Sequence, residues 1–262
     1  MAARFIQVYP VDEKSVLWRY LDFSKYVSLL ENENLYFCPA YYLRQADYYE
    51  MRIPKPYKIE HKENIDAFLQ SKEYDKRTID LLNKQLESEE DSGLHFYSIN
   101  CWQLSEIESN AMWKVYLSSS EGVAIKSSVK RLSNSLLSGD LPYFAGQVQY
   151  INYDKEKFIN SDVSTGFEIP FHKSSFFKYE EEYRISSIIM FEAGTILDIP
   201  EVFGTSKRAR DSLYHPVDLE ILIEEVYVSP YSSDWFYELV KTLTNKYISP
   251  HVKVRRSDIM PV

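Results

Sequence analysis

FKYEEEYRISSIIM, residues 177–190, predicts a buried β-strand that opens on a cluster of charges. Its second half is rich in β-branched residues, which favour strands. Because side chains alternate between the faces of a strand, one face is expected to carry Glu180, Glu182, Arg184 and Ser186. Two carboxylates and a guanidinium on one buried face are costly unless they pair or take part in chemistry. One interpretation of this segment is therefore structural, either an internal ion pair or a solvated edge strand, and the other is a functional site.

The rest of the chain mixes single strands with helices. Strands are predicted at residues 16–20, 35–38, 95–102, 123–126, 147–153, 225–228 and 252–255. Helices are predicted after Asp22 and over residues 62–90, 105–117 and 232–246, the last with Trp235, Leu239 and Leu243 facing inward. This order predicts an α+β fold, in which residues 1–262 form a single domain with a twisted mixed or antiparallel sheet and flanking helices.

Composition and charge limit the functional classes. The chain of 262 residues is 45% hydrophobic and contains only two cysteines, Cys38 and Cys101. Two cysteines are too few for a disulfide scaffold or a cysteine-based zinc site, so free thiols in a reducing cytoplasm are expected. The sequence shows neither a secretion signal nor an apolar run of about 20 residues, so no membrane association is expected. The net charge of −9 opposes non-specific binding to nucleic acid.

Common catalytic and metal-binding motifs are absent from the sequence. The five histidines are isolated and show neither H-x-x-x-H nor H-x-x-E-H spacing. No G-x-S-x-G elbow, Walker loop or G-x-G-x-x-G occurs either. We therefore predict no metal site and find no support for a serine hydrolase, a P-loop NTPase or a Rossmann dehydrogenase.

The predicted helix at residues 105–117 carries a carboxylate in an unusual position. Glu108 falls beside Met112 and Val115, because residues three and four apart share a helix face. Two interpretations remain for Glu108. It either caps a neighbouring backbone segment or pairs with a buried arginine, or it supports a ligand.

Several ordered blocks resemble the bacterial family catalogued as domain of unknown function 2971, over roughly residues 16–259. These blocks are LWRY at 17–20, NCW at 100–102, ESNAMWKVY at 108–116, GVAI at 122–125, GQVQYINY at 146–153, Lys173 with Phe177, Glu180-x-Glu182-x-Arg184, and VYVSP at 226–230. Two departures stand out. Asp47-Tyr48-Tyr49-Glu50 replaces an acidic-Pro-Phe-Glu turn, and Gln103 and Val115 occupy places where the family can carry histidine. A mechanism that depends on histidine is therefore not expected.

The order of arginine, serine and Glu-x-Glu also resembles that of ADP-ribosyltransferases, which use NAD. This resemblance implies that Glu182 stabilises the oxocarbenium-like ribose while Glu180 orients or deprotonates the acceptor. It implies further that Arg19 holds phosphate or ribose and that Ser98 supports Glu182. The expected activity is that of an NAD-dependent ADP-ribosyltransferase or NAD glycohydrolase-like effector in a bacterial defence or toxin system. Such an effector would have a neutralising protein partner.

The same resemblance implies stacking of the nicotinamide on Tyr20, Trp113 or Tyr116. Glu108, Lys173 and Arg184 are expected to support the site without contacting the substrate. Two alternatives stay open. The first is a non-enzymatic module that binds a protein through the tyrosine-rich residues 41–57, with the Glu/Arg strand as an internal ion-pair spine. The second is a metal-dependent nuclease-like effector that uses Glu108, Glu180 and Glu182.

Overall fold

The computed structural model describes residues 4–70, 94–137, 142–158, 165–189, 206–248 and 250–260. Its main sheet contains strands β1 (Phe5–Tyr9), β2 (Val16–Asp22), β4 (Cys38–Pro39), β5 (Tyr97–Leu104), β6 (Gly122–Ser128), β7 (Tyr143–Gln147), β10 (Glu182–Ile188), β12 (Glu225–Val228) and β13 (Lys253–Arg256). The strands follow the order β1-β7-β10-β5-β2-β6-β12-β13, and β4 pairs with β5. β1 and β7 pair in parallel, as do β12 and β13, while the other pairs are antiparallel.

Two small ladders accompany this sheet. β3 (Asn34–Tyr36) pairs with β11 (Tyr214–Pro216), and β8 (Gln149–Ile151) pairs with β9 (His172–Ser174). The fold is α+β with a mixed sheet, as predicted. Strands from both halves of the sequence lie interleaved in the main sheet, so no division near the middle of the chain separates them.

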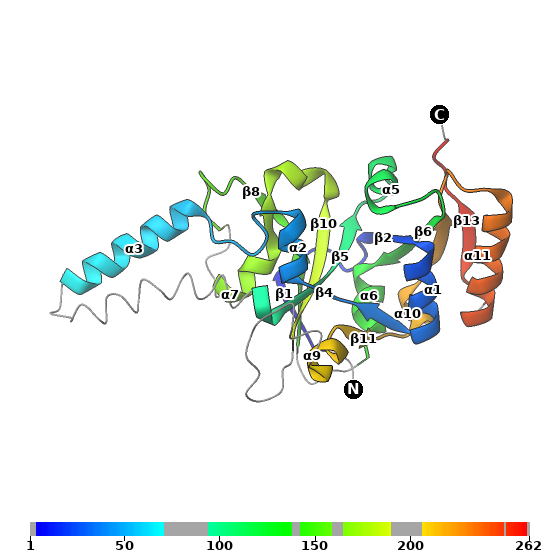
Figure 1. Cartoon of the computed structure of the whole chain (residues 1–262), viewed down its shortest axis with the longest axis horizontal. Helices are drawn as coiled ribbons and strands as arrows, with labels where there is room; N and C mark the ends of the chain where they lie inside the picture. The colour runs from blue at the N-terminus through cyan, green and yellow to red at the C-terminus, as the bar shows by residue number, and fades with distance from the viewer. Residues whose placement is uncertain are drawn as a thin grey trace.

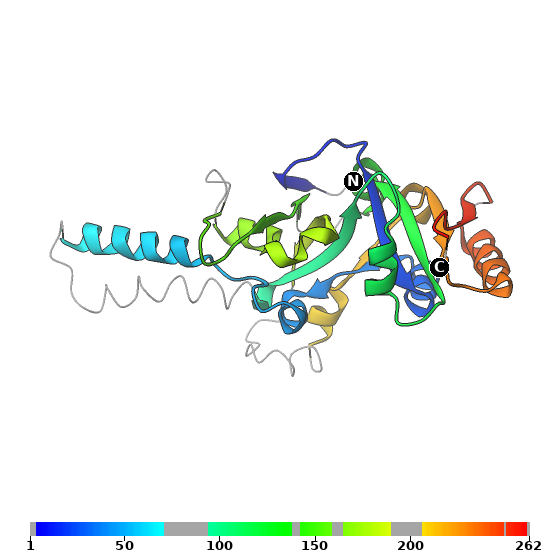
Figure 2. The same cartoon turned by 90° about the horizontal axis from the view of Figure 1, so that it is seen from above.

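Helices lie against the sheet and at both ends of the molecule. They are α1 (Phe23–Asn32), α2 (Ala40–Ala46), α3 (Lys55–Gln70), α5 (Asn110–Tyr116), α6 (Val129–Ser135), α7 (Thr165–Glu168), α9 (Lys207–Asp211), α10 (Leu219–Leu222) and α11 (Asp234–Tyr247), with 3-10 turns at Ile169–Phe171 and Ser175–Glu180. α3 projects from one end of the molecule and α11 lies at the other (Figures 1 and 2). None of the described helices is both long and apolar enough to cross a membrane.

The largest apolar core lies between the sheet and helices α1, α6, α10 and α11. Tyr183 and Ile185 of β10 enter this core together with Leu30 of α1 and Val240 of α11. A second core lies under α5, where Trp113 packs with aromatic residues of β2 and β12. Each face of the sheet is thus covered by a different set of elements.

β10 forms where the sequence predicts a strand, with the predicted alternation of faces. It lies between β5 and β7 and pairs with both. The start of the strand differs from the prediction, because Ser175–Glu180 forms a 3-10 turn and Glu181 adopts φ 45°. This left-handed residue redirects the chain, so pairing begins at Glu182 rather than near Glu180.

Two helix predictions need correction. The helix predicted from residue 105 begins at Asn110, because the Ser109 hydroxyl caps it by accepting from Met112 N. The helix predicted at residues 62–90 corresponds in its first part to α3, and residues 71–90 lie outside the described residues.

The inward face of α11 is rotated by one residue from the prediction. Phe236, Val240 and Thr244 are buried, whereas Trp235 is 59% exposed. The polar Thr244 can face inward because its hydroxyl donates to Val240 O and lies 2.7 Å from the Tyr26 hydroxyl. A hydrophobic pattern alone does not detect such a pairing.

The β1–β7 pair provides a test of the fold. A Cβ at Gly146 would lie 2.6 Å from Tyr9 N and 2.9 Å from Tyr9 O, and both are backbone atoms. We expect Gly146→Ala to lower the free energy of unfolding by about 1–3 kcal/mol in urea titrations, because overpacking forces the strands apart. The exposed neighbour Gln147 supplies the control, and Gln147→Ala should stay within about 0.5 kcal/mol of wild type. Equal stabilities for the two variants would contradict the close approach of β1 to β7.

Candidate functional site

A gap in strand pairing opens the main sheet. β2 pairs with β6 continuously from Val16 to Asp22, but it pairs with β5 only at Leu17 and Trp18. Beyond these two positions β2 and β5 diverge. A cavity of about 450 Å³, here called the central cavity, is lined by both strands.

Side chains from many parts of the chain meet in the central cavity. β2 and β5 form two walls, and the rest comes from α1, β3, β4, α2 with the turn after it, α5, β9, the 3-10 turn before β10, and β10 itself. The polar and aromatic residues of its wall include Trp18, Arg19, Tyr20, Asp47, Glu50, Cys101, Gln103, Tyr116, Lys173, Glu180, Glu182 and Arg184. Arg19, Tyr20 and Tyr116 were predicted as ligand contacts and Glu180 and Glu182 as the carboxylate pair, and all five lie in this one cavity.

Glu182 is held between two cations. Its Oε2 accepts from Arg184 Nε at 2.6 Å, and its Oε1 accepts from Lys173 Nζ at 3.0 Å. The same Lys173 ammonium also donates to Glu180 Oε2. Both oxygens of Glu182 therefore have charged partners, and the side chain is only 2% exposed to solvent.

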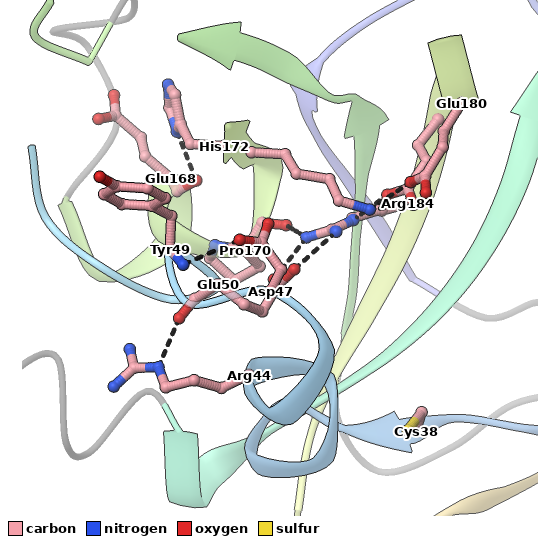
Figure 3. Close-up of polar contacts among 12 residues, drawn as sticks. Cys38, Arg44, Asp47, Tyr49, Glu50, Glu168, Pro170, His172, Glu180 and Arg184 are labelled. Carbon is pink, nitrogen blue, oxygen red and sulfur yellow. Dashed lines mark hydrogen bonds and ion pairs between the residues drawn. The ribbon is translucent and has the colours of Figure 1, made fainter. Parts of the chain in front are cut away.

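Four of the five N–H donors of Arg184 are engaged within the protein. Its Nη1 and Nη2 donate to the two oxygens of Glu50 at 2.7 and 2.9 Å, and Nη1 also donates to Pro170 O at 2.7 Å. Figure 3 shows the guanidinium aimed at Glu50. The internal ion pair predicted from the sequence is therefore present, and the central cavity lies beside it.

The two carboxyls differ in their affinity for protons. Burial raises the pKa of Glu182, but the charges of Arg184 and Lys173 outweigh burial and hold its pKa well below the usual range. Burial, together with a hydrogen bond to Glu182, raises the pKa of Glu180 to about 7. At neutral pH Glu182 is therefore ionised while Glu180 can gain or lose a proton. A pair divided in this way suits a charge stabiliser beside a general acid or base.

Arg19 is a cation without a counter-ion among the described residues. Its Nη1 donates to Cys101 O at 3.1 Å, and its guanidinium lies 5.6 Å from the centre of the Trp102 ring. Burial lowers its pKa. A half-buried guanidinium with unused donors in a cavity wall favours an anionic ligand.

Two tyrosines of the cavity play different parts. The Tyr20 hydroxyl accepts from Ser109 N at 2.7 Å, and its ring packs edge-on against Trp113. Tyr20 therefore fixes the start of α5. The Tyr116 hydroxyl, in contrast, has no hydrogen-bond partner within the described ranges, and burial followed by the nearby Glu182 charge raises its pKa. Tyr116 is free to contact a ligand.

Ser98 does not support Glu182 as predicted. Its Oγ lies 3.5 Å from Ser187 O, inside the sheet. Glu182 pairs with Gln103, five positions further along β5, and an odd separation puts two side chains on opposite faces. Ser98 therefore lies on β5, next to β10 as a supporting role requires, but its side chain is on the face opposite Glu182.

Trp113 and Glu108 form a separate contact outside the central cavity. Trp113 Nε1 donates to Glu108 Oε2 at 2.8 Å, and the same carboxylate accepts from Ser257 Oγ and Asp258 N, both at 2.6 Å. The capping interpretation of Glu108 is therefore the correct one, and Trp113 is a core residue with no ligand-facing surface here. The three carboxylates of the nuclease alternative do not gather. The described part of the chain also holds no group of three or more His, Cys, Asp or Glu side chains arranged for a metal ion.

The sequence interpretation missed three polar residues of the cavity. Glu50 is the bidentate partner of Arg184, and Asp47 and Gln103 each present a buried oxygen without a hydrogen-bond partner among the described residues. The sequence did hold a signal for Asp47 and Glu50, because the turn Asp47-Tyr48-Tyr49-Glu50 keeps both acidic residues of the family's acidic-Pro-Phe-Glu pattern although it lacks the proline.

A second hollow continues the central cavity beside α1. It measures about 270 Å³ and shares four wall residues with the central cavity, namely Arg19, Leu21, Lys25 and Tyr36. Tyr214 lines its far side, and the Tyr36 and Tyr214 rings are 5.4 Å apart. The two hollows together form an elongated site with cationic side chains at the junction.

The comparison with protein families matches the segment that supplies α5, Lys173 and the Glu-x-Glu turn. Residues 112–185 match the family model described as protein of unknown function (DUF2971). The predicted resemblance to this family is confirmed over that segment, which includes Tyr116, Glu180, Glu182 and Arg184. Neither the curated proteins nor the solved structures yielded a match. The resemblance to ADP-ribosyltransferases therefore stays a prediction.

The Arg184–Glu50 pair provides a stability test. We expect Glu50→Ala to lower the free energy of unfolding by about 3–5 kcal/mol, because it leaves a buried guanidinium without its main partner. The matched control is Glu60→Ala. Glu60 pairs with Lys157 at 2.8 Å, but both side chains are about half exposed, so a change below about 1 kcal/mol is expected. Similar losses for both variants, measured by chemical unfolding, would show that burial does not set the strength of the Arg184–Glu50 pair.

Proposed function

We propose that the protein binds NAD and breaks the bond between nicotinamide and ribose, passing the ADP-ribosyl group to an acceptor or to water. The observation that carries this proposal is the pairing of an ionised Glu182 with a titratable Glu180 in the cavity that Arg19 also enters. Two carboxyls with separated pKa values and an unpaired guanidinium match the needs of glycosidic bond cleavage on a phosphate-bearing substrate.

The charges of the cavity favour a ligand that is cationic at one end and anionic further along. Around Glu182 the acids Asp47, Glu50 and Glu180 outnumber the two cations, Lys173 and Arg184. NAD carries a positive charge on its nicotinamide ring and negative charges on its pyrophosphate. The ring would lie at the acidic end and the pyrophosphate near Arg19 and Lys25, with the second hollow open to the adenosine half.

The proposed reaction requires charge stabilisation at the ribose. The bond from ribose C1′ to the ring nitrogen breaks, and its electron pair moves to nitrogen and neutralises the ring. The ribose becomes an oxocarbenium-like cation, which the Glu182 carboxylate stabilises at short range. The acceptor then forms the new bond to C1′ and gives its proton to Glu180, whereas water that attacks C1′ in its place releases its proton to the solvent. With water the products are ADP-ribose, nicotinamide and a proton.

The remaining residues of the cavity would position these groups. Arg184 and Lys173 hold the two oxygens of Glu182, which fixes the carboxylate and keeps it ionised. Tyr116 would stack on the substrate or donate a hydrogen bond to it. A protein that consumes NAD in this way would act as an effector, for which a neutralising protein partner is expected.

Replacement of Glu182 tests the catalytic assignment. Glu182→Gln keeps the shape of the side chain but removes its charge, so nicotinamide release from NAD should fall about 100- to 1,000-fold. Glu181→Gln is the matched control, because Glu181 is adjacent in sequence but exposed. Thermal unfolding of each variant separates a loss of folding from a loss of rate. Equal release by wild type and Glu182→Gln would remove this assignment, and no release by wild type would leave the protein-binding alternative.

The raised pKa of Glu180 predicts a pH dependence of transfer. A general base must be deprotonated, so the ratio of protein-bound ADP-ribose to free ADP-ribose should rise with pH through about 7. The assay uses NAD labelled in its adenosine half with cell lysate as acceptor. In Glu180→Gln the ratio should be low and independent of pH, while nicotinamide release falls less than transfer does. A pH profile that Glu180→Gln leaves unchanged would assign the proton to another group.

A further inference from the structure

Gln103 carries a buried amide whose oxygen has no hydrogen-bond partner in the described part of the chain. It is only 3% exposed, and its buried Oε1 has no hydrogen-bond partner among the residues that the structure describes. Burying an amide without a partner is costly. A buried polar atom without a protein partner at a cavity wall is a candidate position for a hydrogen bond to a ligand.

The surroundings of Gln103 leave it available to a ligand. On one side it is the cross-strand neighbour of Glu182, whose two oxygens are occupied by Arg184 and Lys173. On the other side it is paired in register with Trp18, whose Nε1 donates to Ser105 O at 3.0 Å. All of these except Ser105 line the central cavity. The Gln103 amide therefore lies in the cavity wall beside the proposed ribose position, and its Oε1 has no partner within the described ranges.

We propose that Gln103 recognises the primary carboxamide of the nicotinamide ring, an inference that rests on the proposed function. A glutamine amide and a carboxamide each offer one carbonyl oxygen and one N–H₂ group, so they can form two hydrogen bonds side by side. This pairing holds whichever way the amide is oriented. The acid form of the ring has no N–H₂ and would add a negative charge close to Glu180 and Glu182. The site is therefore selective for the amide.

Two ring compounds that cannot be cleaved test this selectivity by titration calorimetry. 1-Methylnicotinamide and N-methylnicotinate carry the same cationic ring and differ only in carboxamide against carboxylate. Wild type is expected to bind the carboxamide at least 10-fold more tightly. Gln103→Leu should weaken carboxamide binding about 10- to 100-fold and change carboxylate binding little, since a lost buried hydrogen bond has this effect. Gln147→Leu, on an exposed strand position, is the control and should match wild type.

The outcomes separate this inference from the proposed function. Equal binding of the two ring compounds by wild type, binding of neither, or an unchanged preference in Gln103→Leu would each overturn the role of Gln103. A glutamine amide can also pair with adenine, so adenosine is titrated in parallel. Weakened adenosine binding with unchanged carboxamide binding would likewise overturn the assignment. Cleavage of NAD is measured separately as nicotinamide release, so its absence would reject the proposed reaction without affecting the binding result.

Discussion

The buried guanidinium of Arg184 is the constraint on which the site depends. Removing such a charge from water costs several kcal/mol, which is comparable to the whole free energy of unfolding of a small domain. The protein offsets this cost with Glu182 on the same strand, with Glu50 in the turn after α2 and with Pro170 O in a 3-10 turn. Three segments distant in sequence are therefore held to one point, and the shape of the central cavity follows from that attachment.

The uneven division of charge in this cluster produces two carboxyls with different chemistry. Arg184 and Lys173 both form ion pairs with Glu182, whereas of these two cations only Lys173 pairs with Glu180, which also lies against the Glu182 carboxylate. One carboxyl is consequently held ionised and the other is poised near neutral pH. The same contacts that stabilise the fold thus prepare the acid–base pair, and a structural and a catalytic role for Arg184 are not opposed.

The separation of β2 from β5 provides the space that this cluster faces. With continuous pairing the two strands would close the sheet, and Arg19 would have no cavity to enter. Because pairing stops after Trp18, the guanidinium of Arg19 reaches Cys101 O across the gap, and its other donors have no partner among the described residues. Arg19 lies apart from the acidic residues around Glu182, so the cavity has a positively charged end and a negatively charged end.

The sequence by itself determined the strand after Glu180, its two chemically distinct faces and the α+β class, because alternation of side chains is a local property of the backbone. It also marked Glu180, Glu182 and Arg19, which the fold brings into one cavity. Only the tertiary structure decided that Glu50 faces Arg184, that the Gln103 oxygen is buried with no partner in the described part of the chain, and that Ser98 and Trp113 lie outside the central cavity. The register between strands sets which face of β5 meets Glu182, and that register depends on packing across the whole sheet.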